Sequence, residues 1–241
     1  TVPPKTPRNV LVFSLVPTGY VHSAIPYGEA ALQIIAEKTG AFSVEISDDI
    51  AVFEPESLER FDAVFFNNAN NELFLPPDFA KLPDGAKEAA RNRDAELKAS
   101  LVDFISSGNG VAVFHASLAI FREWEEWGDI VGGRFDNHPW NKEVTIRVEE
   151  PEHPLLQAFA GPEFKVHDEI YQVKGPYSRE THRVLLSLDL EKSGEPNVAE
   201  VHRTDGDLAL AWIKPYGQGR VFYCGLGHEH DLFWNPAILR F

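Results

Sequence analysis

The chain has 241 residues, of which 44% are hydrophobic and 24% are charged, and its 37 acidic and 22 basic residues give a formal net charge of −15. This composition predicts one soluble globular domain over residues 1–241 and disfavours binding to nucleic acids or anionic membranes. The single cysteine, Cys224, excludes an intrachain disulfide and a zinc site of several cysteines. No apolar run reaches membrane-spanning length, and the compartment stays open between the cytoplasm and export with removal of a signal.

The first half of the chain alternates between strand and helix patterns. Short and nearly continuous apolar runs predict strands that are buried on both faces. We expect these strands at residues 9–16, 42–46, 62–67 and 111–114. This β-α-β order predicts a doubly wound α/β domain with a parallel sheet.

Two long helices are expected between these strands. The first begins near Pro26 and ends by Gly40, with a buried stripe of Ala30, Ala31, Ile34 and Ile35. Residues 68–92, which are rich in Pro, Asn and Asp, are interpreted as a long surface excursion. The second helix follows them and ends before Gly108, with an apolar face of Leu97, Leu101, Phe104 and Ile105.

The second half of the chain is richer in strand patterns than in helix patterns. Strands are expected at residues 144–148, 164–173, 184–188, 208–213 and 220–224. Because short turns separate several of them, the parallel sheet is predicted to gain an antiparallel extension.

Polar side chains follow the predicted parallel strands at the points where those strands end: His22, Asn68, His115 and His228. In open α/β sheets the carboxyl ends of the strands meet at one edge, and ligands bind there. A single histidine in such a place is more often a hydrogen-bonded structural residue. Several of them together predict a functional site.

Two further segments carry polar residues. Residues 132–140 are interpreted as a tight loop that bears Arg134, His138 and Trp140. Residues 167–171 are expected within a strand, where Glu169 and Tyr171 share one face and Asp168 points to the other. Since charged neighbours in a strand usually place one side chain in solvent, a conservative interpretation gives a role to only one of the two carboxylates.

The residue types of this site suit three kinds of chemistry. Histidines and carboxylates transfer protons, and aromatic rings stack on sugar faces. The spacing of His228 and His230 would place two imidazoles on the same side of an extended segment, which makes them candidate ligands of zinc or another divalent metal. Cys224 lies inside a strand pattern and not at a strand-to-helix elbow, so nucleophilic catalysis has little support.

Four separated motifs resemble those of the ThuA-like family: GVAVFHAS (110–117), GGRFDNHPW (132–140), HDEIYQ (167–172) and LALAWIKPYGQGRVFYCGLGH (208–228). The resemblance spans nearly the whole chain. It implies a class I glutamine amidotransferase-like fold, a flavodoxin-like three-layer α/β/α sandwich with a mostly parallel sheet and an antiparallel extension. It also implies a link to the utilisation of trehalose and related disaccharides, in which members act on keto-sugar derivatives that partner sugar dehydrogenases supply.

The resemblance also assigns individual residues. The histidine after the family's fourth strand corresponds to His115, its HP histidine to His138 and its terminal LGH histidine to His228. Its DE-x-Y segment corresponds to Asp168, Glu169 and Tyr171, and its early histidine to His22. His115 lies about where true amidotransferases carry their nucleophilic cysteine, so glutamine hydrolysis is expected to be absent.

Together these patterns favour an enzyme that acts on a disaccharide or keto-sugar, with His115 and Glu169 as candidate general acid and base. The candidate substrate-binding residues are His22, Asn68, Arg134, His138, Trp140, Asp168, Tyr171 and His228. Two alternatives stay open: a noncatalytic carbohydrate-binding or accessory protein, and a zinc-dependent hydrolase that uses His228, His230 and a third histidine. The oligomeric state is open too, with a homo-oligomer among the options.

Overall fold

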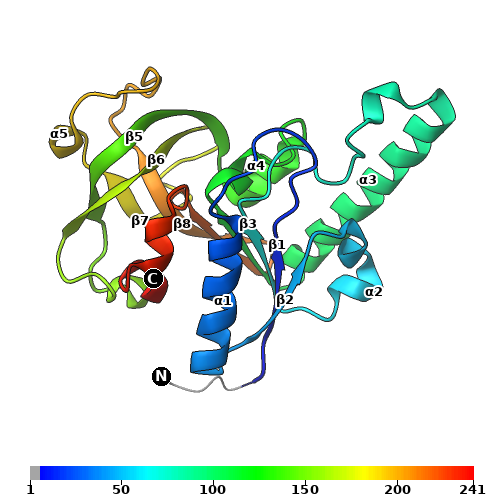
Figure 1. The fold of residues 1–241 in the computed structure, drawn as a ribbon, viewed down its shortest axis with the longest axis horizontal. Helices are drawn as coiled ribbons and strands as arrows, with labels where there is room; N and C mark the ends of the chain where they lie inside the picture. The colour runs from blue at the N-terminus through cyan, green and yellow to red at the C-terminus, as the bar shows by residue number, and fades with distance from the viewer. Residues whose placement is uncertain (1–5) are drawn as a thin grey trace.

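The computed structural model describes residues 6–241, and its strands form one mixed sheet in the order β2-β1-β3-β4-β9-β8-β7-β5-β6 (Figure 1). The first five strands of this order are parallel. They are β2 (Ser43–Ser47), β1 (Asn9–Phe13), β3 (Ala63–Asn67), β4 (Gly110–Phe114) and β9 (Gly219–Cys224). The predicted α/β class with a parallel sheet is confirmed.

The apolar runs form strands because both faces of the parallel half bear apolar side chains. In β3, Val64 and Phe66 belong to the core on one face, whereas Phe65 packs into the core on the other. The first strand is shorter than the predicted range 9–16, since it ends at Phe13. The chain leaves the sheet at that point and forms the loop that carries His22.

The helices cover the two faces of the parallel half. Helix α1 (Ile25–Thr39) packs on one face, and α2 (Pro55–Leu58), α3 (Asp84–Ser106) and α4 (Glu125–Val131) contribute to the core on the other. Short 3-10 turns connect the elements: η1 (Ile50–Phe53), η2 (Phe79–Lys81), η3 (His115–Ala119), η4 (Pro154–Leu156), η5 (His230–Trp234) and η6 (Ile238–Arg240). Within residues 6–241, no helix is both long enough and apolar enough to cross a membrane.

The predicted face of α3 is buried as expected, but the predicted stripe of α1 is wrong. Ile34 is 41% exposed, and the residues of α1 that are buried are Gly28 and Ala36. Small residues serve here because α1 lies very close to the sheet: a Cβ atom on Gly28 would lie 2.2 Å from Oδ1 of Asn67. The segment 68–92 also differs from a surface excursion, since Leu73 is buried and α3 already begins at residue 84.

The antiparallel half, at the left of Figure 1, consists of β8 (Ala209–Tyr216), β7 (Arg183–Leu188), β5 (Arg134–Val148) and β6 (Glu163–Lys174), and a short helix α5 (Leu190–Ser193) follows β7. This confirms the predicted extension. The expectation of a tight loop at 132–140 is wrong, because most of it is the first part of β5. Two register shifts against β6 accommodate this irregular segment, and the second shift includes Pro139, which lacks an N–H donor.

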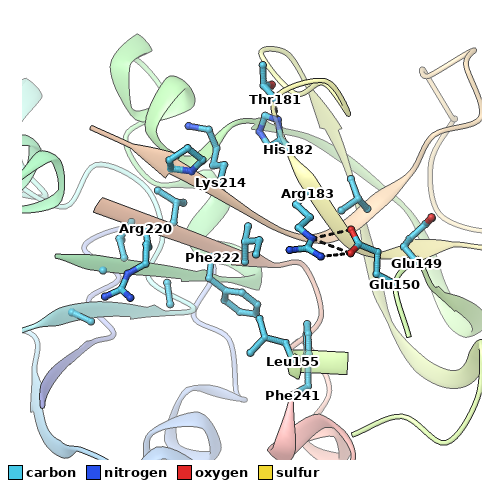
Figure 2. Close-up of a pocket in the computed structure, with 18 of the residues that line it drawn as sticks. Glu149, Glu150, Leu155, Thr181, His182, Arg183, Lys214, Arg220, Phe222 and Phe241 are labelled. Carbon is cyan, nitrogen blue, oxygen red and sulfur yellow. Dashed lines mark hydrogen bonds and ion pairs between the residues drawn. The ribbon is translucent and has the colours of Figure 1, made fainter. Parts of the chain in front are cut away.

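A groove of about 1390 Å³ lies at the amino ends of the parallel strands, where the strand starts at Val10, Ala63 and Gly110 line it (Figure 2). Its charged groups include a bidentate pair between Arg183 and Glu150. Phe222 belongs to its apolar wall. The carboxyl ends of the same strands, where the predicted site residues lie, are at the opposite edge of the sheet.

The loop that follows β9 is held by one buried carboxylate on β6. Asp168 accepts hydrogen bonds from the backbone N–H groups of Gly227, His228 and Glu229, at 2.8, 3.0 and 3.0 Å. Burial raises the pKa of the Asp168 carboxyl, and the nearby His115 together with the N–H groups of Gly227 and Glu229 oppose that rise. Asn68 adds a second link, because it accepts from the N–H of Ala116 and donates to the carbonyl of Gly227. The position of His228 therefore depends on both side chains.

We expect Asp168→Asn to lower the free energy of unfolding by about 1–3 kcal/mol, because the amide has one acceptor oxygen for three buried N–H donors. Urea denaturation of the two proteins measures the change. Asp231→Asn, at an exposed position of the same loop, is the control and should have little effect. Equal stability of Asp168→Asn and the unmodified protein would contradict this account of the loop.

We also expect the thiol of Cys224 to be unreactive in the folded protein. It is buried in β9, and burial raises its pKa to about 12, so the reactive thiolate is scarce at neutral pH. Titration with a disulfide reagent should detect no thiol under native conditions and one thiol per chain in guanidinium chloride. Ala99→Cys, on the exposed side of α3, gives the matched reactive control. Rapid native labelling of Cys224 would show that β9 is accessible.

Candidate functional site

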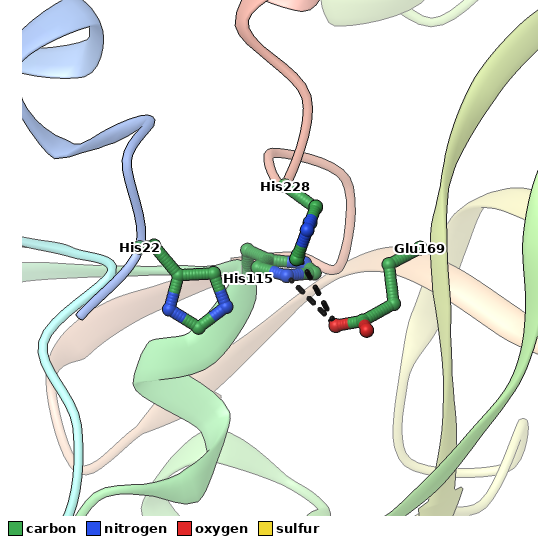
Figure 3. A group of neighbouring side chains, drawn as sticks. All are labelled: His22, His115, Glu169 and His228. Atoms are coloured by element: carbon green, nitrogen blue, oxygen red, sulfur yellow. Dashed lines mark ion pairs between the residues drawn. The ribbon is translucent and has the colours of Figure 1, made fainter. Parts of the chain in front are cut away.

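Four side chains from distant segments converge at the carboxyl edge of the parallel strands: His22, His115, Glu169 and His228 (Figure 3). One donor atom from each residue lies within 4.8 Å of the corresponding atoms of the other three. The loop after β1, the end of β4, strand β6 and the loop after β9 supply them. We call this group the histidine cluster.

His115 is fixed by its backbone and by its own ring. It directly follows β4 with a left-handed φ of 45°, which turns the chain sharply at the strand end. Its Nδ1 lies 2.7 Å from the carbonyl oxygen of Gly225. Since a carbonyl can only accept, Nδ1 carries the proton and the lone pair of Nε2 points into the cluster.

Glu169 is the carboxylate that several of these imidazoles contact. Its Oε2 lies 3.5 Å from Nε2 of His115 and 3.3 Å from Nδ1 of His228, and its Oε1 lies 3.3 Å from Nδ1 of His138. Burial opposes ionisation, but the contacts with His115 and His228 outweigh it and hold the pKa of this carboxyl well below its usual range. The contact with Glu169 in turn raises the pKa of His228.

The cluster and its neighbour His138 contain buried nitrogen atoms that have no hydrogen-bond partner among residues 6–241. They are Nδ1 of His22, His138 and His228, and Nε2 of His115. Burial, together with the nearby His115 and His228, lowers the pKa of His22 to about 3. A neutral His22 thus presents a lone pair. Because buried polar atoms are nearly always satisfied, these nitrogens call for a ligand, an ion or water.

Several predicted site residues do come together. His22, His115, Glu169 and His228 form the cluster, and His138 contacts it through Glu169. The ring of Tyr171 lies 4.3 Å from that of His115, and burial raises the pKa of its hydroxyl. Both carboxylates of β6 are buried, so neither side chain lies in solvent: Glu169 faces the imidazoles, and Asp168 holds the loop on the other side.

Four other predicted residues lie outside the cluster. Asn68 and Asp168 are fully buried, and their polar groups are engaged by the backbone, which gives them a positioning role in place of the expected substrate contact. Trp140 is also buried, in the core with Ile170, and its indole N–H donates to the carbonyl of Gly194, so it is no sugar platform. Trp140 pairs with Ile170, which points to the opposite face of β6 from Glu169.

Arg134 is directed away from the cluster as well. Its guanidinium donates to the carbonyl of Glu125 at the start of α4. Neighbouring residues of a strand point to opposite faces, and it is Phe135 whose ring lies 4.6 Å from Tyr171. The predicted substrate contact of Arg134 is therefore not supported by its position.

His230 does not pair with His228 as predicted. Its Nε2 lies 2.7 Å from the hydroxyl of Ser23, and its ring stacks on Tyr27 at 4.3 Å. The chain bends at His228 and begins η5 at His230, so the alternation of an extended segment does not apply. The imidazole of His228 therefore lies in the cluster, whereas that of His230 contacts Ser23 and Tyr27.

Two exposed residues near the cluster were missed in the sequence. Tyr20 is 60% exposed, and its ring lies 4.8 Å from that of His22 and parallel to that of His228 at 6.3 Å. Its place two residues before His22 was the only available signal. The guanidinium of Arg122 lies 5.6 Å from the centre of the Phe135 ring, which also contacts Tyr171, and nothing in the sequence around Arg122 indicates this position.

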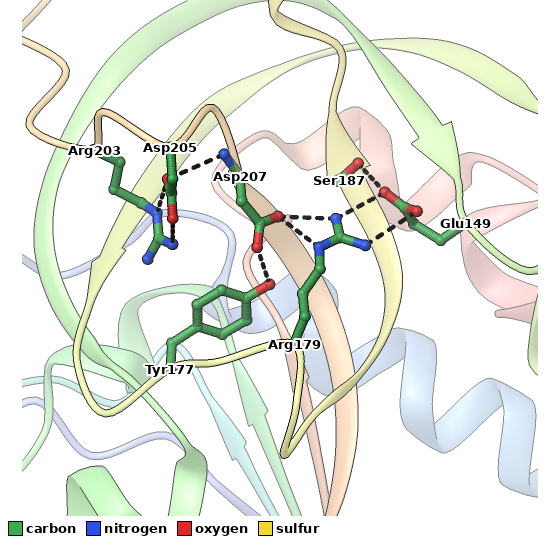
Figure 4. A network of polar contacts seen from close by, with 7 residues as sticks. All are labelled: Glu149, Tyr177, Arg179, Ser187, Arg203, Asp205 and Asp207. Atoms are coloured by element: carbon green, nitrogen blue, oxygen red, sulfur yellow. Dashed lines mark hydrogen bonds and ion pairs between the residues drawn. The ribbon is translucent and has the colours of Figure 1, made fainter.

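A second polar network lies in the antiparallel half, and every charge in it is paired (Figure 4). Arg179 contacts Glu149 at 3.0 Å and Asp207 at 2.8 Å, and the hydroxyl of Tyr177 donates to Asp207. These paired groups connect the loops between β-strands to one another. The histidine cluster differs, because its nitrogens face a shared point and do not hydrogen-bond to one another.

The arrangement allows proton transfer, binding of a polar ligand, or coordination of a metal ion by the cluster. It does not provide a cysteine nucleophile, because the only cysteine is buried in β9 and burial raises its pKa.

Solved structures share the fold of the whole chain. A ThuA-like protein from Bacteroides uniformis has a TM-score of 0.72 and 18% identity, with 99% of this chain and 89% of that chain covered. A ThuA-like protein from Parabacteroides merdae has a TM-score of 0.62 and 18% identity, over 92% and 80%. A β-galactosidase from Bacillus circulans has a TM-score of 0.53 and 9% identity, with 93% of this chain and 29% of that chain covered. At these identities the likeness concerns the fold alone.

A sequence search among curated proteins finds no match. The sequence profile of the family described as ThuA, trehalose utilisation, matches residues 9–241. This range includes every residue of the histidine cluster and all the strands that position it. The chain therefore belongs to the ThuA family of trehalose utilisation, which gives it a carbohydrate-related function.

Proposed function

We propose that this protein is an enzyme that transfers a proton next to the carbonyl group of a keto-sugar, as an isomerase or lyase of disaccharide-derived substrates. The observation that carries the proposal is the contact between Glu169 and His138 beside the histidine cluster. The side chain of His138 is 39% exposed, whereas His115 is 0% exposed. A group that exchanges protons with a substrate must reach it, and His138 does.

The substrate class follows from the family and from the surface around the cluster. Family membership supports a sugar. The exposed ring of Tyr20 at the mouth of the site is the kind of surface on which a sugar face stacks. The net charge of −15 favours a neutral sugar over a phosphorylated one.

The proton transfer uses the two nitrogens of His138 separately. We assign the proton of His138 to Nδ1, which lies 3.3 Å from Oε1 of Glu169, and this leaves the lone pair of Nε2 free to accept a proton. Nε2 removes a proton from the carbon next to the carbonyl, and the electrons of the broken C–H bond form an enolate on the carbonyl oxygen. Return of the proton to the former carbonyl carbon, with transfer of the proton of the neighbouring hydroxyl to the enolate oxygen, completes an isomerisation. In an elimination the enolate electrons instead form a C=C bond as the carbonyl is restored, and the β-substituent leaves with its bonding electron pair and takes up the proton.

Glu169 has a positioning role in this scheme, and its low pKa fits that role better than the role of general base. A base works best when its pKa lies near the working pH. A carboxyl whose pKa is held well below its usual range is a weak proton acceptor. It is a good anchor for imidazoles, because it stays ionised.

We expect a 3-keto disaccharide to raise the melting temperature of the protein, since a ligand at 100 times its Kd adds about 2.7 kcal/mol to stability. The parent disaccharide is measured beside it. Tyr20→Ala should weaken binding by about 3- to 10-fold through the lost stacking. Val21→Ala, an equally exposed neighbour, is the control. No shift with any keto-sugar would contradict the substrate class.

We expect His138→Gln to slow the exchange of substrate C–H for deuterium in D2O by about 10²- to 10⁴-fold, as loss of an acid–base group does. Proton NMR of the keto-sugar follows the exchange. His167→Gln, at an exposed position of β6, should leave the rate unchanged. Exchange at the full rate in His138→Gln would remove His138 from the reaction. Binding without any exchange in the unmodified protein would instead indicate a noncatalytic carbohydrate-binding protein.

A further inference from the structure

We propose that the histidine cluster binds one divalent transition-metal ion, with His22, His115, His228 and Oε2 of Glu169 as its ligands. The proposal deepens the proposed function and rests on it only for the catalytic use of the ion. Binding of the ion itself depends on the geometry of the cluster alone.

The spacing of the donor atoms fits one ion. Zinc–nitrogen and zinc–oxygen bonds of about 2.1 Å in a tetrahedral site place the ligand atoms about 3.4 Å apart. Oε2 of Glu169 lies 3.5 Å from Nε2 of His115 and 3.3 Å from Nδ1 of His228. All four donor atoms lie within 4.8 Å of one another, so they surround a single point.

The protonation pattern presents lone pairs to that point. Nε2 of His115 faces it because Nδ1–H is committed to the carbonyl of Gly225. The buried Nδ1 atoms of His22 and His228 have no hydrogen-bond partner within the described residues. An ion would satisfy three nitrogens at once, which no single hydrogen-bond donor could do.

The outer contacts resemble those that orient ligands in metal sites. A ligating histidine usually donates its other N–H to a carbonyl or carboxylate, as His115 does to Gly225. A ligating carboxylate is usually hydrogen-bonded in turn, as Oε1 of Glu169 is placed to be by His138. Asp168 fixes the backbone of His228 from the far side of β6.

The donor set also selects the class of metal. Three imidazoles with one carboxylate suit zinc, iron, nickel and related ions, whereas magnesium and calcium prefer oxygen ligands throughout. One carboxylate leaves a divalent ion with net positive charge. Such an ion would act as a Lewis acid toward a carbonyl oxygen that joined it as a fifth ligand, and His138 lies on the other oxygen of the same carboxylate.

The test is metal binding by the purified full chain. Protein treated with a chelator is titrated calorimetrically with Zn²⁺, Ni²⁺ and Mg²⁺, and bound metal is counted by mass spectrometry after desalting. We expect one Zn²⁺ or Ni²⁺ per chain and no binding of Mg²⁺. Co²⁺ should give the visible absorption bands of a nitrogen-coordinated ion.

His22→Gln, His228→Gln and Glu169→Gln should each weaken Zn²⁺ binding by at least about 100-fold. His230→Gln, a histidine two residues from His228 and outside the cluster, should bind as the unmodified protein does. Circular dichroism and thermal unfolding identify any variant that fails to fold, and the Co²⁺ spectrum of the remaining variants then decides. A spectrum unchanged in both His22→Gln and His228→Gln overturns the ligand assignment, as does loss of binding in His230→Gln.

Failure of this inference and failure of the proposed function are separable. Absence of stoichiometric Zn²⁺ or Ni²⁺ overturns the metal site, and a keto-sugar that still raises the melting temperature of the chelated protein would keep the proposed function intact. One bound ion whose binding depends on His22, His228 and Glu169 supports the metal site, whether or not a keto-sugar binds. Absence of keto-sugar binding counts against the proposed function alone.

Discussion

The site depends on one geometric constraint, the opposite orientation of two neighbouring carboxylates on a strand. Asp168 and Glu169 stand side by side in β6, and the pleat sends them to different faces. Asp168 accepts three N–H groups from the loop after β9, and Glu169 meets the imidazole that this loop delivers. One carboxylate fixes where His228 lies, and the other gives it a partner. A shift of β6 by one residue would exchange the two roles and disrupt both.

The parallel half explains why the polar side chains of the candidate site lie together at one edge of the sheet. All five parallel strands end on the same side, so the residues that follow them are neighbours whatever their distance along the chain. His115 and Asn68 both leave their strands with a left-handed backbone, which turns the chain directly at the strand end. The groove of about 1390 Å³ lies at the opposite, amino ends of these strands, and its Arg183 and Glu150 are paired with each other.

Most of the fold could be predicted from the sequence, because apolar runs of five or six residues mark buried strands and Gly40 and Gly108 mark helix ends. The start of β5 could not, since its pairing with β6 contains register shifts that no simple alternation reveals. The cluster residues were predictable from their places at strand ends. Which of them contact the cluster and which only position it could not be predicted. The burial of Asn68 and Trp140 depends on partners that are distant in the chain. The chain also bends at His228, so the two-residue spacing that suggested His230 does not place the two imidazoles on the same side.

The place of β9 in the sheet has a consequence for the chain during its synthesis and folding. Strand β4 pairs on one side with β3, but its partner on the other side is β9, which is synthesised more than a hundred residues later. Until then β4 is an open edge of a half-built sheet, a surface that invites pairing with other chains. Long-range pairing of this kind slows folding, because a large loop must close first. Nascent chains are accordingly most exposed to aggregation while the ribosome is still producing the antiparallel half. The histidine cluster is complete only after β9 and the loop that carries His228 have been made.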